Sequence, residues 1–121
     1  MKSIHVKFSD ITNSKNDVFD TNAIIDNNMI KYVDNTKTKV SLNYKDDILI
    51  RENSDYIFNI DFNKNIIDIT LKKFNKMFSK DIKTLLIKKD NKSYIVRYKL
   101  VDEEVINEYE ILYWFYYLNM F

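Results

Sequence analysis

Few side chains in this sequence are able to do chemistry. His5 is the only histidine, cysteine is absent, and Arg51 and Arg97 are the only arginines among 17 lysines. A lone histidine can act as a general base. No nucleophile or second metal ligand is identifiable, and His5 alternates with Ile4 and Val6 on a predicted strand, so we interpret it as a surface residue. The sequence therefore predicts no catalytic site, no metal site and no cofactor.

The two arginines are the next candidates, because an arginine in an apolar strand is suited to hold a carboxylate or phosphate in bidentate contact. Arg97 has Glu110 opposite it in the hairpin described below, which favours a structural ion pair on the outer face. Arg51 has no obvious partner. A structural role is the simpler interpretation of Arg51, and we also keep it as a candidate ligand-binding residue.

Two pairs of carboxylates occur next to each other in the chain. Asp46-Asp47 and Glu103-Glu104 both fall in predicted turns. An acid–base pair or a metal site would need ligands that converge in a protected cleft. We therefore interpret both pairs as solvated turn residues.

Tyrosine is abundant, with nine residues, and five of them are predicted to face inward. A buried tyrosine hydroxyl usually needs a hydrogen-bond partner, and phenylalanine would be simpler in a dry core. The hydroxyls could therefore ring a cavity that holds water or a small ligand. The competing interpretation, which we favour, is that AT-rich codon usage supplied the tyrosines and that the core is filled. Together with Arg51, the candidate ligand-binding residues are Tyr56, Tyr94, Tyr98, Tyr109 and Tyr113.

The element that must position most of these residues is a long hairpin, Ser93–Leu118, with Asp102–Val105 as its loop. One register places apolar groups opposite apolar groups and basic groups opposite acidic ones, as stabilising cross-strand pairs require. A slip of one residue would move each side chain to the wrong face. The predicted pairs are Tyr98 with Tyr109, Val96 with Ile111, Tyr94 with Tyr113, Arg97 with Glu110 and Lys99 with Glu108.

The same register places a row of large apolar groups on the outer face of the final strand. A monomer rarely leaves such a patch open. One cover is a short helix predicted over Lys73–Ile82, where Phe74, Met77, Phe78 and Ile82 recur at helical spacing. The other is a second copy of the chain related by a two-fold axis. The candidate interaction surface consists of Leu112, Trp114, Tyr116 and Leu118.

The rest of the chain alternates as short strands joined by tight turns. Glycine and proline are both absent. Asparagine and aspartate, the next best residues for left-handed turn positions, stand where glycine would. The expected turns are at Asn27-Asn28, Asp46-Asp47, Asn63-Lys64 and Asp90-Asn91. The predicted strands are Ser3–Ile11, Val18–Asp26, Met29–Val33, Lys37–Tyr44, Ile48–Asn53, Tyr56–Phe62, Asn65–Lys73 and Lys83–Lys89.

Two of these hairpins carry register information. Around Asn63-Lys64, Ile60 should face Ile67. Around Asp90-Asn91, Leu85 should face Val96. The turn at Lys45–Asp47 leaves its register open, since two- and three-residue loops both fit.

These elements predict one all-β domain over residues 1–121. We expect an up-and-down barrel of about ten short antiparallel strands with one short helical segment near 73–82. Closure into a barrel hides the strand edges best, and a two-sheet sandwich is the alternative.

Charge and hydropathy limit the partners. The 19 basic and 18 acidic residues nearly cancel, which favours neither nucleic acid nor an anionic membrane. The lysine cluster Lys72–Lys92 is weak support for nucleic-acid binding. The longest apolar run, Ile111–Leu118, is too short for a membrane span, and the N-terminal segment is too polar for a signal peptide. We expect a cytoplasmic protein.

In the order and lengths of its strands the chain resembles the YwiB-like family of small bacterial proteins. The resemblance is carried by IHVKF (Ile4–Phe8), AIIDNNMIKYVD (Ala23–Asp34), KVSLNYKDDILIRENS (Lys39–Ser54) and KTLLIKKDNKSYIVRYKL (Lys83–Leu100). It implies a lipocalin-like, calycin-type β-barrel. It implies no activity and no catalytic residues.

The leading hypothesis is a non-enzymatic binding protein whose barrel accepts a small, largely apolar ligand. The alternative is a protein–protein interaction module that uses the aromatic outer face of the last strand. Nucleic-acid binding through Lys72–Lys92 is a third hypothesis, and enzymatic activity is the last, because no candidate groups support it.

Overall fold

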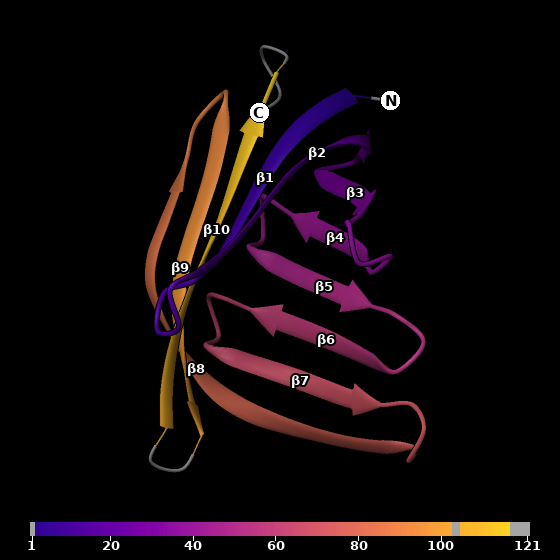
Figure 1. The fold of residues 1–121 in the computed structure, drawn as a ribbon, viewed down its shortest axis with the longest axis vertical. Helices are drawn as coiled ribbons and strands as arrows, with labels where there is room; N and C mark the ends of the chain where they lie inside the picture. Colours follow the sequence, from indigo (N-terminus) through magenta and orange to yellow (C-terminus); the bar gives the residue numbers. More distant parts are fainter. Residues whose placement is uncertain (1, 103–104, 117–121) are drawn as a thin grey trace.

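The computed structural model describes residues 2–102 and 105–116, which form a closed barrel of ten antiparallel strands. Each strand pairs with its neighbours along the chain, and pairing of the first strand with the last closes the barrel. The all-β barrel predicted from the sequence is therefore confirmed (Figure 1). The strands are β1 (Lys2–Asp10), β2 (Lys15–Asp26), β3 (Met29–Val33), β4 (Lys39–Asn43), β5 (Ile48–Glu52), β6 (Tyr56–Asp61), β7 (Ile66–Leu71), β8 (Lys76–Lys89), β9 (Ser93–Asp102) and β10 (Val105–Phe115).

Two long strands join the two halves of the barrel. β2 pairs with β1 through residues 15–23 and with β3 through residues 24–26. β8 pairs with β7 through residues 76–81 and with β9 through residues 82–89. Figure 1 shows β1, β9 and β10 crossing β3–β7 at a steep angle. Strands that pass from one half to the other in this way are typical of orthogonal packing.

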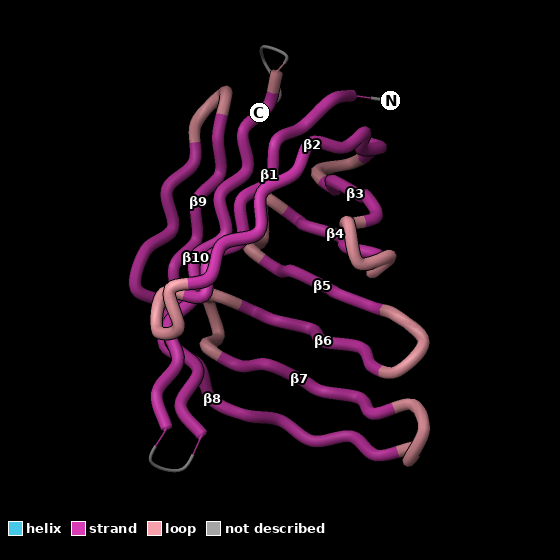
Figure 2. Tube along the Cα trace, viewed as in Figure 1, coloured by secondary structure: helices cyan, strands magenta, loops and turns pink. Residues whose placement is uncertain are grey.

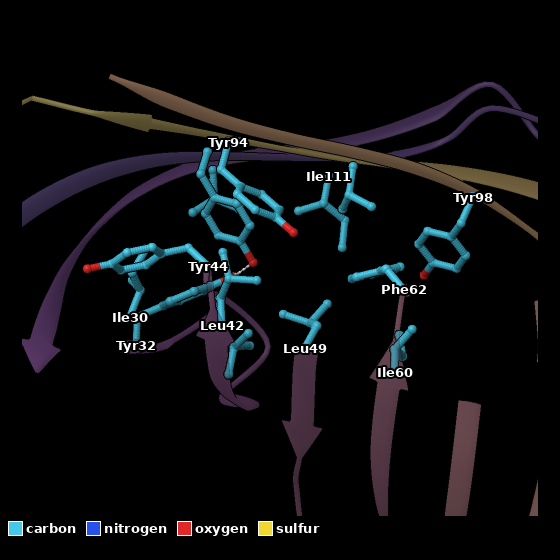
Figure 3. Packing of buried hydrophobic residues seen from close by; sticks show 14 of the residues in the cluster. Ile30, Tyr32, Leu42, Tyr44, Leu49, Ile60, Phe62, Tyr94, Tyr98 and Ile111 are labelled. Atoms are coloured by element: carbon cyan, nitrogen blue, oxygen red, sulfur yellow. Dashed lines mark hydrogen bonds between the residues drawn. The ribbon is translucent and has the colours of Figure 1, made fainter. Parts of the chain in front are cut away.

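The core lies between these two halves. Inward-facing side chains alternate with outward-facing ones along each strand, as the period of two requires. Figure 3 shows Tyr94, Tyr98 and Ile111 projecting from one half toward Leu42, Leu49 and Ile60 of the other. The largest fully buried side chains are Tyr94, Tyr113, Phe62 and Phe115.

The turns reach left-handed backbone angles without glycine. Asn27 and Asn28 have φ values of 48° and 68° and form the two-residue turn between β2 and β3, as predicted. Four other turns, at residues 11–14, 44–47, 62–65 and 72–75, each end in one left-handed residue. Those residues are Ser14, Asp47, Asn65 and Asn75, so asparagine, aspartate and serine replace glycine there.

Two predicted turns differ in detail. The left-handed residue near Asn63-Lys64 is Asn65, because the turn has four residues and its last position carries the positive φ. The turn after β4 also has four residues, at 44–47, so neither the two-residue nor the three-residue loop considered for it is correct. Asp47 in this turn is buried, contrary to its interpretation as a solvated residue, whereas Asp46 is exposed.

The helix predicted over residues 73–82 is wrong. The described residues contain no helix (Figure 2), and this segment is the 72–75 turn followed by the first half of β8. Phe78 and Ile82 are four residues apart, which fits one face of a helix and equally well one face of a strand. Phe74 and Met77 decide between the two, because they are 69% and 75% exposed and pack on no core.

The hairpin registers are mostly confirmed. All five predicted pairs between β9 and β10 are present, and Ile60 faces Ile67 between β6 and β7. Between β8 and β9, however, Val96 faces Ile87 and not Leu85, because the chain reverses between Asp90 and Ser93, one residue later than predicted. The connecting loop is also longer, at residues 90–92. Glu103-Glu104, in the loop of the last hairpin, lie outside the described residues.

Candidate ligand-binding site around Arg51

Arg51 lies on the inner face of β5, between Val40 of β4 and Phe58 of β6. Its Nη2 donates a hydrogen bond of 3.2 Å to Oδ2 of Asp34, and its guanidinium carbon lies 5.7 Å from the centre of the Phe8 ring. The guanidinium is partly buried. The partner that sequence reasoning did not find is therefore Asp34, at the end of β3.

Asp34 is held rigidly by the turn that follows it. Its Oδ1 accepts hydrogen bonds from the backbone N–H of Thr36 at 2.8 Å, the Thr36 hydroxyl at 2.7 Å and the backbone N–H of Thr38 at 3.0 Å. Burial alone would raise the pKa of Asp34. The hydrogen bonds from Thr36 and Thr38 and the charge of Arg51 outweigh that effect, so the pKa is lowered. Asp34 is therefore a fixed carboxylate that directs its second oxygen at Arg51.

A partly enclosed cavity of about 90 Å³ adjoins this ion pair. A water molecule takes about 30 Å³ in the liquid, and pockets for drug-sized ligands measure about 300–1,000 Å³. The cavity thus admits a compact chemical group and not a whole drug-sized molecule. We call it the Arg51 cavity; its lining is Val6, Phe8, Asp17, Phe19, Tyr32, Asp34, Thr36, Val40, Leu49, Arg51, Ile111 and Tyr113.

Two tyrosines form the inner wall of the Arg51 cavity. The hydroxyls of Tyr32 and Tyr113 are 2.7 Å apart in a buried hydrogen bond. Burial raises the pKa of Tyr32 well above its usual value and that of Tyr113 to about 12. Both phenols are therefore neutral at physiological pH. Since one hydroxyl donates to the other, the accepting hydroxyl keeps its own hydrogen for a further partner.

Tyr94 belongs to a different polar cluster, on the turn at residues 44–47. Its hydroxyl donates to Oδ1 of the buried Asp47 at 2.8 Å, and Nζ of Lys89 lies 3.1 Å from the same oxygen. Nδ2 of Asn63 donates to Oδ2 of Asp47 at 3.3 Å. Burial, followed by the hydrogen bond to Asp47, raises the pKa of Tyr94. This cluster gives Tyr94 a structural partner.

The other predicted tyrosines pack against aromatic rings. Tyr98 is buried, with its ring centre 5.3 Å from that of Phe62 and 5.5 Å from that of Tyr109. Tyr56 stacks on Phe58 at 4.0 Å. Of the tyrosines proposed as ligand-binding residues, only Tyr113 lines the Arg51 cavity; Tyr56, Tyr94, Tyr98 and Tyr109 do not.

Sequence reasoning missed Tyr32 and Asp34. Tyr32 lies two residues after Ile30 in a correctly predicted strand, so the alternation pattern could have placed it on the same inner face. Asp34, Thr36 and Thr38 follow in the order Asp-x-Thr-x-Thr, which is typical of an aspartate that caps a turn. Neither signal indicates that Arg51, 17 residues further on, is the ion-pair partner.

The C-terminal end of the outer face of β10 carries apolar side chains, as predicted. Trp114 is 44% exposed and Tyr116 56% exposed, and Leu112 is half-buried. Leu118 lies outside the described residues. The predicted helical cover does not exist, since residues 73–82 form a turn and part of β8.

His5 and Arg97 also lie on this outer face. His5 is opposite Trp114, with its Nδ1 2.7 Å from Oδ1 of Asp20, and the Tyr116 hydroxyl donates to the same oxygen at 3.0 Å. Nε and Nη2 of Arg97 donate to Oε2 of Glu110 at 3.0 Å and 2.6 Å, which is the predicted ion pair. In the described part of the chain, no group of three or more histidine, cysteine, aspartate or glutamate side chains is arranged to hold a metal ion.

Comparison with known proteins found no matching family model, no matching curated protein and no matching solved structure. The described residues contain no helix that could span a membrane.

Proposed function

We propose that this protein is a non-enzymatic binding barrel, and that a small, uncharged amphipathic ligand places a compact polar group in the Arg51 cavity. The observation that supports this most is the cavity itself, which brings a guanidinium and a phenol pair together among apolar walls. We include in the proposal the YwiB-like resemblance, which is compatible with a closed ten-strand barrel, and a cytoplasmic location.

The charges around the cavity favour a neutral ligand. The cavity is lined by one guanidinium, that of Arg51, and by two carboxylates, those of Asp34 and Asp17. An anionic group would gain one cationic contact and face two like charges. A carbonyl oxygen, by contrast, accepts hydrogen bonds from the guanidinium without adding charge. Arg51 carries five N–H donors, and the contact to Asp34 uses one of them among the described residues.

The apolar walls of the Arg51 cavity suit a short apolar part of the ligand beside its polar group. Phe8, Phe19 and Leu49 line the cavity beside the polar groups. The volume of about 90 Å³ limits the buried part to a few non-hydrogen atoms, so any longer apolar part would lie outside. The ligand expected from the sequence, small and largely apolar, is thereby narrowed to one with a compact carbonyl-bearing head.

The test is a titration of isotope-labelled protein with butanamide, followed by nuclear magnetic resonance. We expect saturable shifts at the Arg51 side chain and along β3 and β10, with butanoate and butylammonium binding more weakly. Arg51→Leu should weaken butanamide binding by about tenfold or more, because hydrogen bonds to a charged group contribute about 1.5–3 kcal/mol. Arg97→Leu, at the outer-face arginine, is the matched control and should bind like the wild type. A folded Arg51→Leu variant with unchanged affinity, or no saturable shift with any probe, would contradict the proposal.

A second candidate function is association through the outer face of β10. The exposure of Trp114 and Tyr116 favours it, since no described element covers them. We propose a second copy of the chain as the partner, placed by a two-fold axis.

Trp114→Lys tests this association. If the face joins two copies, the wild type is a dimer by light scattering with a quencher-protected Trp114, and the variant is a folded monomer. Ile24→Lys is the matched control and should keep the dimer, because Ile24 is an exposed apolar residue of β2 that pairs with β3 and lies away from β10. If the wild type is monomeric and its Trp114 is accessible to quencher, the proposed association through β10 is wrong.

A further inference from the structure

The turn between β7 and β8, together with the start of β8, displays the two most exposed large apolar side chains of the described residues. They are Phe74 and Met77, and Lys72, Lys73 and Lys76 stand beside them in the chain. We call residues 72–77 the lysine-rimmed tip. It is separate from the Arg51 cavity and from the outer face of β10, since none of its residues lines the cavity or pairs with β10.

The lysine-rimmed tip is a fixed part of the barrel and not a loose end. Asn75 takes the left-handed conformation with φ of 47°, and its backbone N–H donates to the carbonyl of Lys72 at 3.2 Å. The backbone N–H of Lys72 donates to the carbonyl of Asp55 at 2.9 Å, and Leu71 pairs with Lys76. Phe74 is therefore held on a hydrogen-bonded turn with its ring in solvent.

Positive charge surrounds this apolar tip. The tip itself, residues 72–77, contains three lysines and no carboxylate, and Asp55 lies beside Lys72. Nζ of Lys73 lies 5.8 Å from the centre of the Phe74 ring. Lys72 is ion-paired with Glu52 at 2.7 Å, so the excess positive charge of the tip comes from Lys73 and Lys76. The net charge of the whole chain does not reveal this local excess. Salt screens charges more than a Debye length away, so a partner at the tip interacts mainly with the charges of the tip.

We propose that the lysine-rimmed tip docks on an anionic lipid surface. Phe74 and Met77 enter the boundary between head groups and acyl chains, and the lysines contact the anionic head groups. Two contributions bind peripheral proteins to membranes: the insertion of apolar side chains and the attraction of lysines to acidic lipids. Lysine suits the rim, since its aliphatic stem lies along apolar surface while its ammonium stays in water.

Single-stranded nucleic acid fits the lysine-rimmed tip less well. Binding of unpaired bases uses a succession of exposed aromatic rings along a basic groove. Only Phe74 offers a freely exposed ring here, while Phe78 is half-buried and Met77 has no ring. The overall charge balance argued against an anionic membrane, but the distribution of charge at the tip argues for one.

Flotation of the full chain with lipid vesicles tests the proposal. We expect binding to vesicles of phosphatidylcholine with phosphatidylserine, no binding to phosphatidylcholine alone, and release by high salt. Phe74→Ser should weaken binding by about tenfold or more, given the value of burying one large apolar side chain. Lys73→Gln with Lys76→Gln should weaken it by a similar factor.

Two matched control variants distinguish binding through the lysine-rimmed tip from nonspecific binding to vesicles. Ile24→Ser removes an exposed apolar side chain of β2, and Lys83→Gln removes a lysine of β8 outside the tip; both should bind as the wild type does. Equal loss in control and tip variants would overturn the proposal. So would binding to neutral vesicles, or Phe74-dependent binding to a single-stranded oligonucleotide with no binding to vesicles.

Discussion

Replacing Asp47 by alanine should lower the free energy of unfolding by about 2–4 kcal/mol, because it leaves the buried hydroxyl of Tyr94 without its acceptor and places alanine at a left-handed backbone position. Asp47 accepts from Tyr94 at 2.8 Å, from Lys89 at 3.1 Å and from Asn63 at 3.3 Å. Its backbone has a φ of 58°, which alanine tolerates poorly. The loss would be a large part of the 5–15 kcal/mol typical of a small domain.

Urea unfolding followed by circular dichroism measures this loss. Asp47→Asn keeps an acceptor and a residue that tolerates positive φ, so it should cost less than alanine. Asp46→Ala is the matched control, since Asp46 is the exposed neighbour in the same turn, and it should cost less than about 0.5 kcal/mol. Equal losses at Asp46 and Asp47 would show that the turn, and not the buried cluster, determines the effect.

Alkaline pH should unfold the protein through its buried phenols. Burial raises the pKa of Tyr32, Tyr94 and Tyr98, and that of Tyr113 to about 12. In the unfolded chain a tyrosine titrates near its ordinary pKa of about 10. A group whose pKa is higher in the folded state stabilises that state below the unfolded pKa. That contribution is lost as pH rises from the unfolded toward the folded pKa.

The expected loss is large. Each such tyrosine costs about 1.4 kcal/mol per pH unit above its unfolded pKa, so four together cost about 5 kcal/mol by about pH 11. Urea unfolding at a series of pH values measures the slope. The double variant Tyr94→Phe, Tyr113→Phe should show about half of the tyrosine contribution to that slope, with the lysine contribution unchanged. Tyrosinate absorbance that rises near pH 10 in the folded protein, with all nine tyrosines titrating together, would contradict the prediction.

The candidate site shows where sequence reasoning reached its limit. Arg51 was identified because an arginine stood in an apolar strand without a partner nearby. Tyr113 was identified from alternation in the last strand. Asp34 and Tyr32 were not, because they meet Arg51 and Tyr113 only after β3, β5 and β10 are brought around the barrel.

The sequence by itself determined the all-β class, most strand positions and the pairing of neighbouring strands. These features depend on local physics: alternation with a period of two places side chains on faces, and cross-strand pairs on a short hairpin select one register. For that reason every predicted pair of β9 with β10 was correct. Residues 73–82 were assigned wrongly because Phe78 and Ile82 fit both periods, and only pairing with β7 and β9 selects the strand.

Only the tertiary structure decided what meets across the barrel. Closure by β1 and β10 places Phe8 and Tyr113 on the same cavity as Arg51, although more than 40 residues separate each of them from it. The structure also leaves Phe74, in the turn between β7 and β8, and Met77, at the start of β8, in solvent, where they pack on no core. Such contacts depend on how far each strand bends and how the two halves cross. Residue periodicity does not encode those quantities, since many curvatures are compatible with the same alternation.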